Sequence, residues 1–162
     1  MGAPLKRSPY LVLLSRDHHE GLLICWKIRE GIALGIAQER LRSFLVTVFP
    51  RKIFPHFSLE EQFLLPLLQP ENPMRVRVEQ EHLAMRQMLA NLEEQSAKGY
   101  GAQEALIDAL DRHIRFEERE FFPYLESNLP ARQLEQVART LEPHHTPGEF
   151  PWNDPFWVRN KG

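Results

Sequence analysis

Apolar residues recur at three- and four-residue steps in four long segments, which is the periodicity of helices that bury one face. The first segment begins after Ser8-Pro9, a capping residue followed by a proline, and fades near residues 31–35. The second runs from about 38 to 68 and contains Pro50 and Pro55 near its middle. Because proline disrupts a helix, we expect a kink or a break at that point.

The third segment opens with Asn72-Pro73, again a capping residue and a proline, and stops at residues 98–101, which include two glycines. The fourth carries an apolar stripe over 106–124. A shorter amphipathic piece follows Pro130, and residues 142–162 are rich in Pro, Trp and Phe without helical periodicity. This last stretch is therefore predicted to be a non-helical tail.

Four long helices joined by short turns predict an all-α fold, an antiparallel up-down four-helix bundle with a short C-terminal helix and an irregular aromatic tail. We expect the bundle to occupy residues 1–141, with its core at about 10–126, and the tail to occupy 142–162. The sequence shows no alternating strand pattern and no glycine-rich nucleotide loop. The aromatic side chains of the tail should pack over the bundle or against a dimer partner.

Charge and cysteine content exclude several classes of protein. The formal net charge is −2 and no run of Lys or Arg marks a nucleic-acid partner. The single cysteine, Cys25, excludes an internal disulfide, and no paired cysteines indicate zinc or haem attachment. The apolar stretch 10–14 is too short for a signal peptide or a membrane span, so we expect a cytoplasmic protein without nucleic-acid or membrane partners.

Two windows of the sequence match each other and carry the candidate chemistry. Starting at His56 and His113, both read His-x-x-x-Glu-Glu-x-x-apolar-apolar-Pro-x-Leu. One His-x-x-x-Glu pair is ordinary on a helix surface, but two copies with the same flanks are a strong signal. Residues four apart share a helix face, so each histidine can reach one metal cluster together with Glu60 or Glu117. Imidazole and carboxylate bind transition metals, and a buried carboxylate needs a compensating cation.

His18 and His82 interrupt the apolar stripes of the first and third segments. In an antiparallel hairpin, two residues at one height are roughly equidistant from the turn. The midpoints between successive candidates fall near 38, 70–71 and 98–99, where turns are predicted independently. The candidate side chains of all four helices should therefore meet in one layer of the bundle.

These residues resemble the hemerythrin-like, or HHE cation-binding, domain family. The similarity covers about 10–126 and rests on Asp17-His18, His56-x-x-x-Glu60, Glu81-His82 and His113-x-x-x-Glu117. It implies a non-haem di-iron centre that is bridged by two carboxylates and by hydroxide or oxide, with an open position for dioxygen or a related small ligand. The implied metal ligands are His18, His56, Glu60, His82, His113 and Glu117.

The sequence departs from the oxygen-carrying members of that family at one position. Those members have a second histidine one turn after the third-helix histidine, where this chain has Arg86. One metal would then have a histidine fewer, which leaves room for water or substrate and weakens the case for simple oxygen carriage. Oxygen carriers also use an aspartate five residues after the last histidine. Glu118 occupies that position here and is a weaker ligand candidate than Glu117.

Other polar residues near the candidates have simpler interpretations. His19 points about 100° away from His18 and should lie on the surface. His144-His145 lies beyond the bundle, and we do not expect it to bind metal. Four acidic residues could orient ligands as hydrogen-bond acceptors, although solvent-facing charge is their expected role. These residues are Asp17, Glu61, Glu81 and Glu118.

The ligand set predicts a dinuclear metal protein, with iron expected and zinc or manganese able to occupy the same ligands. Its partner would be a small diatomic ligand or peroxide, and its role sensing, scavenging or storage of oxygen, nitric oxide, peroxide or iron. A di-iron enzyme, peroxidase-like or repairing iron centres, is the alternative, because Arg86 leaves an open site. A ferritin-like site needs two Glu-x-x-His motifs, and the sequence has one candidate, ending at His82. A bundle without metal predicts that His56→Ala is neutral or stabilising.

Overall fold

The computed structural model describes residues 8–94, 99–146 and 148–159. Within these ranges every regular element is helical and no strand occurs. Residues 1–7, Lys98 of the expected third turn, and residues 147 and 160–162 of the expected tail lie outside the described residues. No described helix is both long and apolar enough to cross a membrane.

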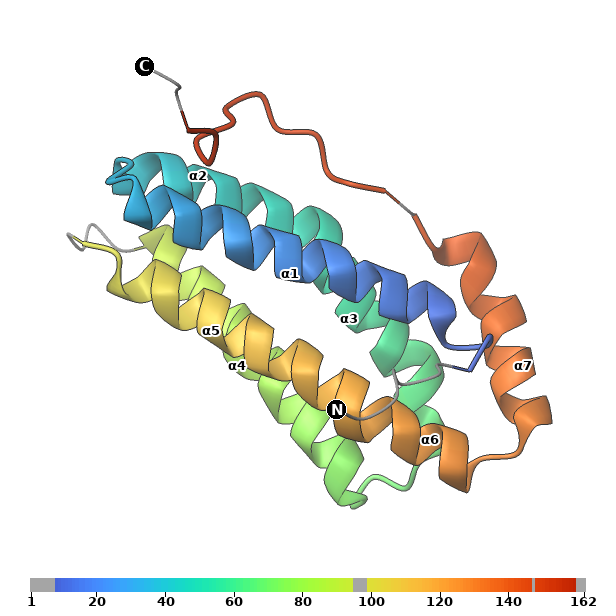
Figure 1. Ribbon diagram of the computed structural model, residues 1–162. Helices are drawn as coiled ribbons and strands as arrows, with labels where there is room; N and C mark the ends of the chain where they lie inside the picture. Colours follow the sequence, from blue (N-terminus) through green and yellow to red (C-terminus); the bar gives the residue numbers. More distant parts are fainter. Residues whose placement is uncertain (1–7, 95–98, 147, 160–162) are drawn as a thin grey trace, which may run out of the picture.

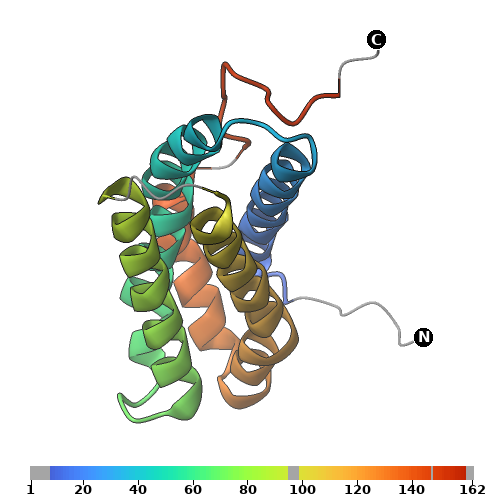
Figure 2. The same cartoon turned by 90° about the vertical axis from the view of Figure 1, so that its left-hand side faces the viewer.

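The chain folds as an antiparallel up-down bundle, as the periodicity predicts (Figure 1). α1 packs against α5, α5 against α4, and α4 against α2 (Figure 2). The elements in chain order are α1 (Val12–Ala33), α2 (Gln38–Val48), η1 (Phe49–Ile53), α3 (Phe54–Leu59), η2 (Glu60–Leu64), η3 (Leu65–Leu67), α4 (Pro73–Glu94), α5 (Gly101–Phe116), η4 (Glu117–Phe121), α6 (Phe122–Asn128), α7 (Ala131–Leu141) and η5 (Glu142–His144).

The bundle has four arms: α1, the segment from α2 to η3, α4, and the segment from α5 to α6. The second and fourth arms are continuous helices with wide turns. η1, η2 and η4 are π-helical, and each ends two residues before a proline: Pro55, Pro66 and Pro123. A proline has no N–H for the carbonyl four residues back, and a wider turn accommodates that loss without ending the helix. The expected interruption near Pro50 and Pro55 is thus a widened turn, and the chain continues as helix to Leu67.

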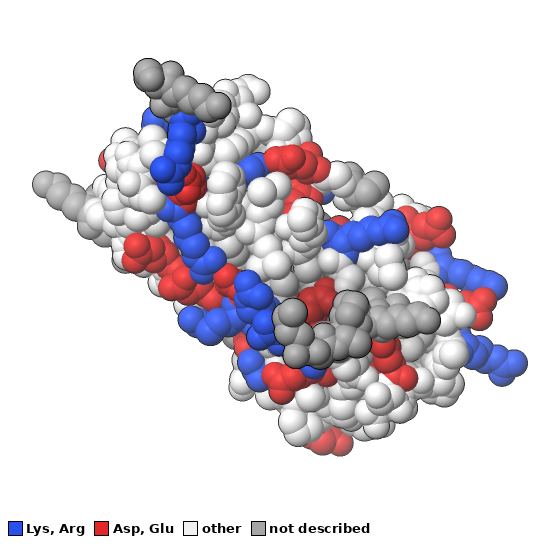
Figure 3. Space-filling model, viewed as in Figure 1, with Lys and Arg blue, Asp and Glu red and all other residues white. Residues whose placement is uncertain are grey.

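Charged side chains of both signs lie next to one another on the face shown in Figure 3. Two such pairs bridge α1 to α5, where Arg29 contacts Asp108 at 2.9 Å and Asp111 at 2.7 Å. Exposed ion pairs of this kind stabilise a fold only slightly. The bundle therefore depends mainly on its buried apolar side chains.

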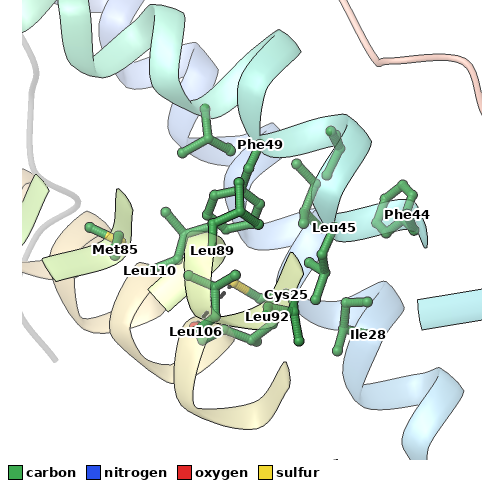
Figure 4. Close-up of a cluster of buried hydrophobic side chains, with 14 of the residues drawn as sticks. Cys25, Ile28, Phe44, Leu45, Phe49, Met85, Leu89, Leu92, Leu106 and Leu110 are labelled. Atoms are coloured by element: carbon green, nitrogen blue, oxygen red, sulfur yellow. Dashed lines mark hydrogen bonds between the residues drawn. The ribbon is translucent and has the colours of Figure 1, made fainter. Parts of the chain in front are cut away.

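Two apolar clusters fill the bundle, one towards each end. The first contains Ile28, Phe44 and Leu89 among its members and is drawn in Figure 4. The second is built around Leu11 and Phe121 and is covered by the apolar face of α7. On every arm, the sequence candidates for metal binding lie where residues of one cluster give way to those of the other. A polar layer thus separates the two cores.

The tail returns along α1 and α2 after α7, so it packs on its own bundle (Figure 1). Phe156 is buried in the first cluster, with its ring centre 5.4 Å from that of Phe44. Gly31 permits this approach, because a Cβ there would lie 2.9 Å from Phe156 Cδ2. The buried Lys27 ammonium also forms an ion pair with Glu149 of the tail. The tail therefore contributes Phe156 to the core.

Replacing Phe156 with alanine should reduce the free energy of unfolding by about 3 kcal/mol, because it leaves a cavity between α1, α2 and the tail. Urea titration at fixed metal content measures the change. Val158→Ala, two residues away and 56% exposed, is the matched control and should change stability by less than about 0.5 kcal/mol. Equal effects of the two substitutions would contradict the assignment of Phe156 to the core.

Candidate metal centre

Six buried polar side chains from all four arms meet in the layer between the two apolar clusters. None is more than 7% exposed, and both glutamates and His82 are fully enclosed. This is the single level that the midpoints in the sequence predict. The residues brought together are His18 of α1, His56 of α3, Glu60 of η2, His82 of α4, His113 of α5 and Glu117 of η4.

The six side chains form two groups of four that share Glu60 and Glu117. His18 and His56 complete one group, and His82 and His113 complete the other. In each group the potential ligand atoms lie within 4.8 Å of one another. Two adjacent groups of this kind, with two carboxylates in common, have the donor atoms that metal cations bind.

The Nε2 atoms of the four histidines face the two shared carboxylates. Glu117 Oε1 lies 3.0 Å from His18 Nε2 and 3.3 Å from His113 Nε2. Glu60 Oε1 lies 3.2 Å from His56 Nε2 and 3.4 Å from His82 Nε2. The donor atoms therefore converge on a small common space.

Several of these converging atoms have no hydrogen-bond partner among the described residues. They are His56 Nε2, both carboxylate oxygens of Glu60, and Glu117 Oε2. Buried polar atoms are nearly always satisfied, and a buried carboxylate without compensation is strongly destabilising. Cations between these atoms would satisfy them, so the residues present fit a metal pair.

Without cations, protons must offset the buried charge. Burial, together with the neighbouring Glu117 carboxylate, raises the pKa of Glu60 to about 8. Burial would lower the pKa of His113, but the charge of Glu117 raises it to about 10. Burial would raise the pKa of Glu117, yet the charge of His113 holds it well below its usual value. The metal-free layer thus keeps protons where metal ions would otherwise bind.

Four further carboxylates contact the outer ring nitrogens of the histidines and orient the rings. Each Nδ1 lies within 2.9 Å of a separate carboxylate oxygen, so each ring can donate outwards from Nδ1 while its Nε2 points inwards. The four pairs are His18–Glu118 (2.7 Å), His56–Asp17 (2.9 Å), His82–Glu61 (2.7 Å) and His113–Glu81 (2.8 Å).

The expectation that these four acids mainly face solvent is wrong. Each follows or precedes a candidate ligand in the sequence but bonds to a histidine on a neighbouring arm. Asp17 of α1 reaches His56 of α3, and Glu61 reaches His82. The four pairs form a closed ring around the bundle. In the sequence, the only sign of this role is that each acid is next to a candidate ligand. Which histidine the acid reaches depends on which arm packs beside it in the bundle.

The acids have partners of their own on the outside of the ring. Arg86 donates to both oxygens of Glu61, at 2.7 and 3.0 Å, and its guanidinium lies 5.6 Å from the Phe54 ring centre. Arg77 donates to Glu81 at 3.1 Å, and the Ser15 hydroxyl donates to Glu118. Arg86 therefore supports the carboxylate behind His82.

The remaining histidines lie outside both ligand groups. His19 is exposed, as expected. His144 is exposed and stacks on Phe63, with ring centres 5.7 Å apart. His145 Nε2 lies 2.7 Å from Asp17 Oδ1, so this tail residue supports the carboxylate that holds His56. The sequence offered no signal for that contact, because it depends on the path of the tail.

Comparison with known proteins adds one match. The family described as the hemerythrin HHE cation-binding domain matches residues 14–125, which is more than half of the chain. No curated protein and no solved structure matches the chain significantly. The matched range contains all six converging side chains and the four outer carboxylates.

The stability of the metal-free protein should fall as pH rises from about 5 to about 8.5, and Glu60→Gln should flatten this dependence. The folded-state pKa of Glu60 lies above its usual 4.5, so its contribution is full below pH 4.5 and is lost as pH approaches about 8. Melting temperatures in a pH series of metal-free protein measure the slope. Glu39→Gln, at an exposed site on α2, is the control and should keep the wild-type slope. An unchanged slope in Glu60→Gln would refute the assignment.

Proposed function

This chain belongs to the hemerythrin HHE cation-binding domain family, and from that premise we propose that it is a di-iron protein for small oxygen- or nitrogen-containing ligands. Its expected role is sensing, scavenging or storage involving oxygen, nitric oxide, peroxide or iron. The observation that carries the proposal is the pair of four-residue groups that share Glu60 and Glu117. The two shared carboxylates favour two adjacent cations over one.

Iron suits this donor set. Each ion would be held by two imidazoles and two shared carboxylates, a mixed nitrogen and oxygen set of the kind found in non-haem iron proteins. Zinc and manganese can bind the same atoms, and Cys25 offers no thiolate to the site, since it is buried beside Ile107. When bound, an iron pair would supply reversible ligand binding and electron transfer to small ligands.

The residues of the chain hold and shield this centre. The outer carboxylates fix the imidazole tautomers, so that Nε2 of each ring is free to act as a ligand. The two apolar clusters lie on either side of the layer and shield it towards both ends of the bundle. Glu60 and Glu117 offset part of the charge of the ions, which lowers the electrostatic cost of burying them.

The enzymatic alternative rests on a cavity of about 200 Å³ that borders His18, His56 and His113. A space beside the ligands gives peroxide or another substrate access to the centre. Sustained peroxide consumption by the iron-loaded protein, lost in Glu117→Ala, would support an enzyme. Stoichiometric binding without turnover would support a sensor, scavenger or store.

Metal analysis of protein purified anaerobically should find two iron ions per chain, with absorption changes on adding oxygen, nitric oxide and peroxide in turn. His18 belongs to one group only, so His18→Ala should reduce the content to about one ion. Glu60 belongs to both groups, so Glu60→Ala should reduce it towards zero. His19→Ala, at the exposed neighbouring position, should retain two ions. Wild-type protein without metal would overturn the proposal.

Replacing an outer carboxylate should weaken metal binding without removing a ligand. Glu81→Gln removes the charge that orients His113, and we expect metal affinity to fall by about 10- to 100-fold. Competition with a chelator of known affinity measures the change. Glu79→Gln alters an acid two residues away that pairs with Arg75 on the surface, and it should have no effect. Equal affinities in both variants would exclude an orienting role for Glu81.

A further inference from the structure

The cavity beside the metal centre has walls of two kinds. Ile53 of η1, Leu59 of α3 and Ile114 of α5 line an apolar side. His18 and His56 line the end that faces the metal centre. The space is therefore amphipathic, because apolar side chains line it together with candidate ligands.

Its volume exceeds the needs of a diatomic ligand. About 200 Å³ is available, whereas a single water needs only about 10–15 Å³ and an apolar cavity of about 150 Å³ binds benzene. A molecule containing one substituted ring fits this space. A diatomic ligand alone would leave most of the apolar wall without contacts.

The tail forms the outer part of the cavity. Thr146, which is exposed, and His145 line it, together with the exposed Arg51 of η1. The Lys52 ammonium anchors this part of the tail by donating to the carbonyl of Thr146 at 3.2 Å and to that of Gly148 at 2.6 Å. His145 is held by Asp17. Hydrogen bonds therefore hold this segment of the tail at the outer edge of the cavity.

The charges favour an anionic ligand. Two divalent ions would carry four positive charges, and Glu60 and Glu117 neutralise two of them. Two carboxylates also line the cavity, and each already has cationic or hydrogen-bonding partners. Glu20 lies 3.3 Å from the Lys52 ammonium, and Asp17 contacts His56 and His145. The remaining positive charge at the inner end would attract an anionic group, while the apolar wall would receive an uncharged body.

We propose that this cavity binds a small organic anion with a body about the size of one aromatic ring, its anionic group directed to the metal centre. This inference rests on the proposed function, because the metal ions supply the positive charge at the inner end. The tail, by way of Thr146 and His145, completes the binding site. The ligand class follows from the volume, the apolar wall and the charge.

Formate and benzoate test the proposal, because they carry the same carboxylate and differ only in the ring. Calorimetric titration of the metal-loaded protein should give at least about tenfold tighter binding of benzoate than of formate. Thr146→Trp should narrow the outer end of the cavity, and Ile53→Phe should take up space beside its apolar wall. Each should weaken benzoate binding by about tenfold and leave formate binding nearly unchanged.

Thr140→Trp is the matched control, because Thr140 is an exposed threonine on α7 outside the cavity. It should bind benzoate as the wild type does. If wild-type protein with two ions binds benzoate no more tightly than formate, the inference is wrong and the proposed function stands. The inference is also wrong, and the proposed function also stands, if Thr146→Trp, Ile53→Phe and the control Thr140→Trp all bind benzoate with the same affinity. Metal analysis of the same samples shows whether the ions are bound. Wild-type protein that binds no metal would overturn both the proposed function and this inference.

Discussion

Two carboxylates buried in the middle of a helical bundle are the constraint on which the rest of this structure depends. Glu60 and Glu117 are fully enclosed, and three of their four oxygens have no hydrogen-bond partner among the described residues. Such charges would destabilise an apolar core by several kcal/mol each if nothing offset them. The histidines around them, and the cations that we propose between them, make the layer compatible with folding.

The ring of histidine–carboxylate pairs extends this constraint to all four arms. Because each acid bonds to a histidine of the adjacent arm, as Glu81 of α4 does to His113 of α5, every pair also joins two helices. Orientation of the ligands and alignment of the helices are thus the same set of contacts. A shift of one helix along its axis would break two pairs at once. This explains how a bundle with a polar layer can keep a single register.

The tail contacts both the apolar core and the polar layer of the bundle. It is anchored in the first apolar cluster by Phe156 and at the polar layer by His145, which supports Asp17. Thr146 of the same segment lines the cavity. A stretch that has no helical periodicity therefore contributes to the core, to the support of Asp17 and to the border of the cavity.

The sequence by itself determined the four arms, the level of the centre and the six converging residues. Those features follow from local spacing, since residues four apart share a helix face and short turns place His18 and His82 at one height. Only the tertiary structure decided the roles of Asp17, Arg86 and His145. Neighbouring residues on a helix point about 100° apart, so a residue beside a ligand faces whichever arm or tail packs there. That choice depends on the arrangement of the whole bundle, which no local pattern contains.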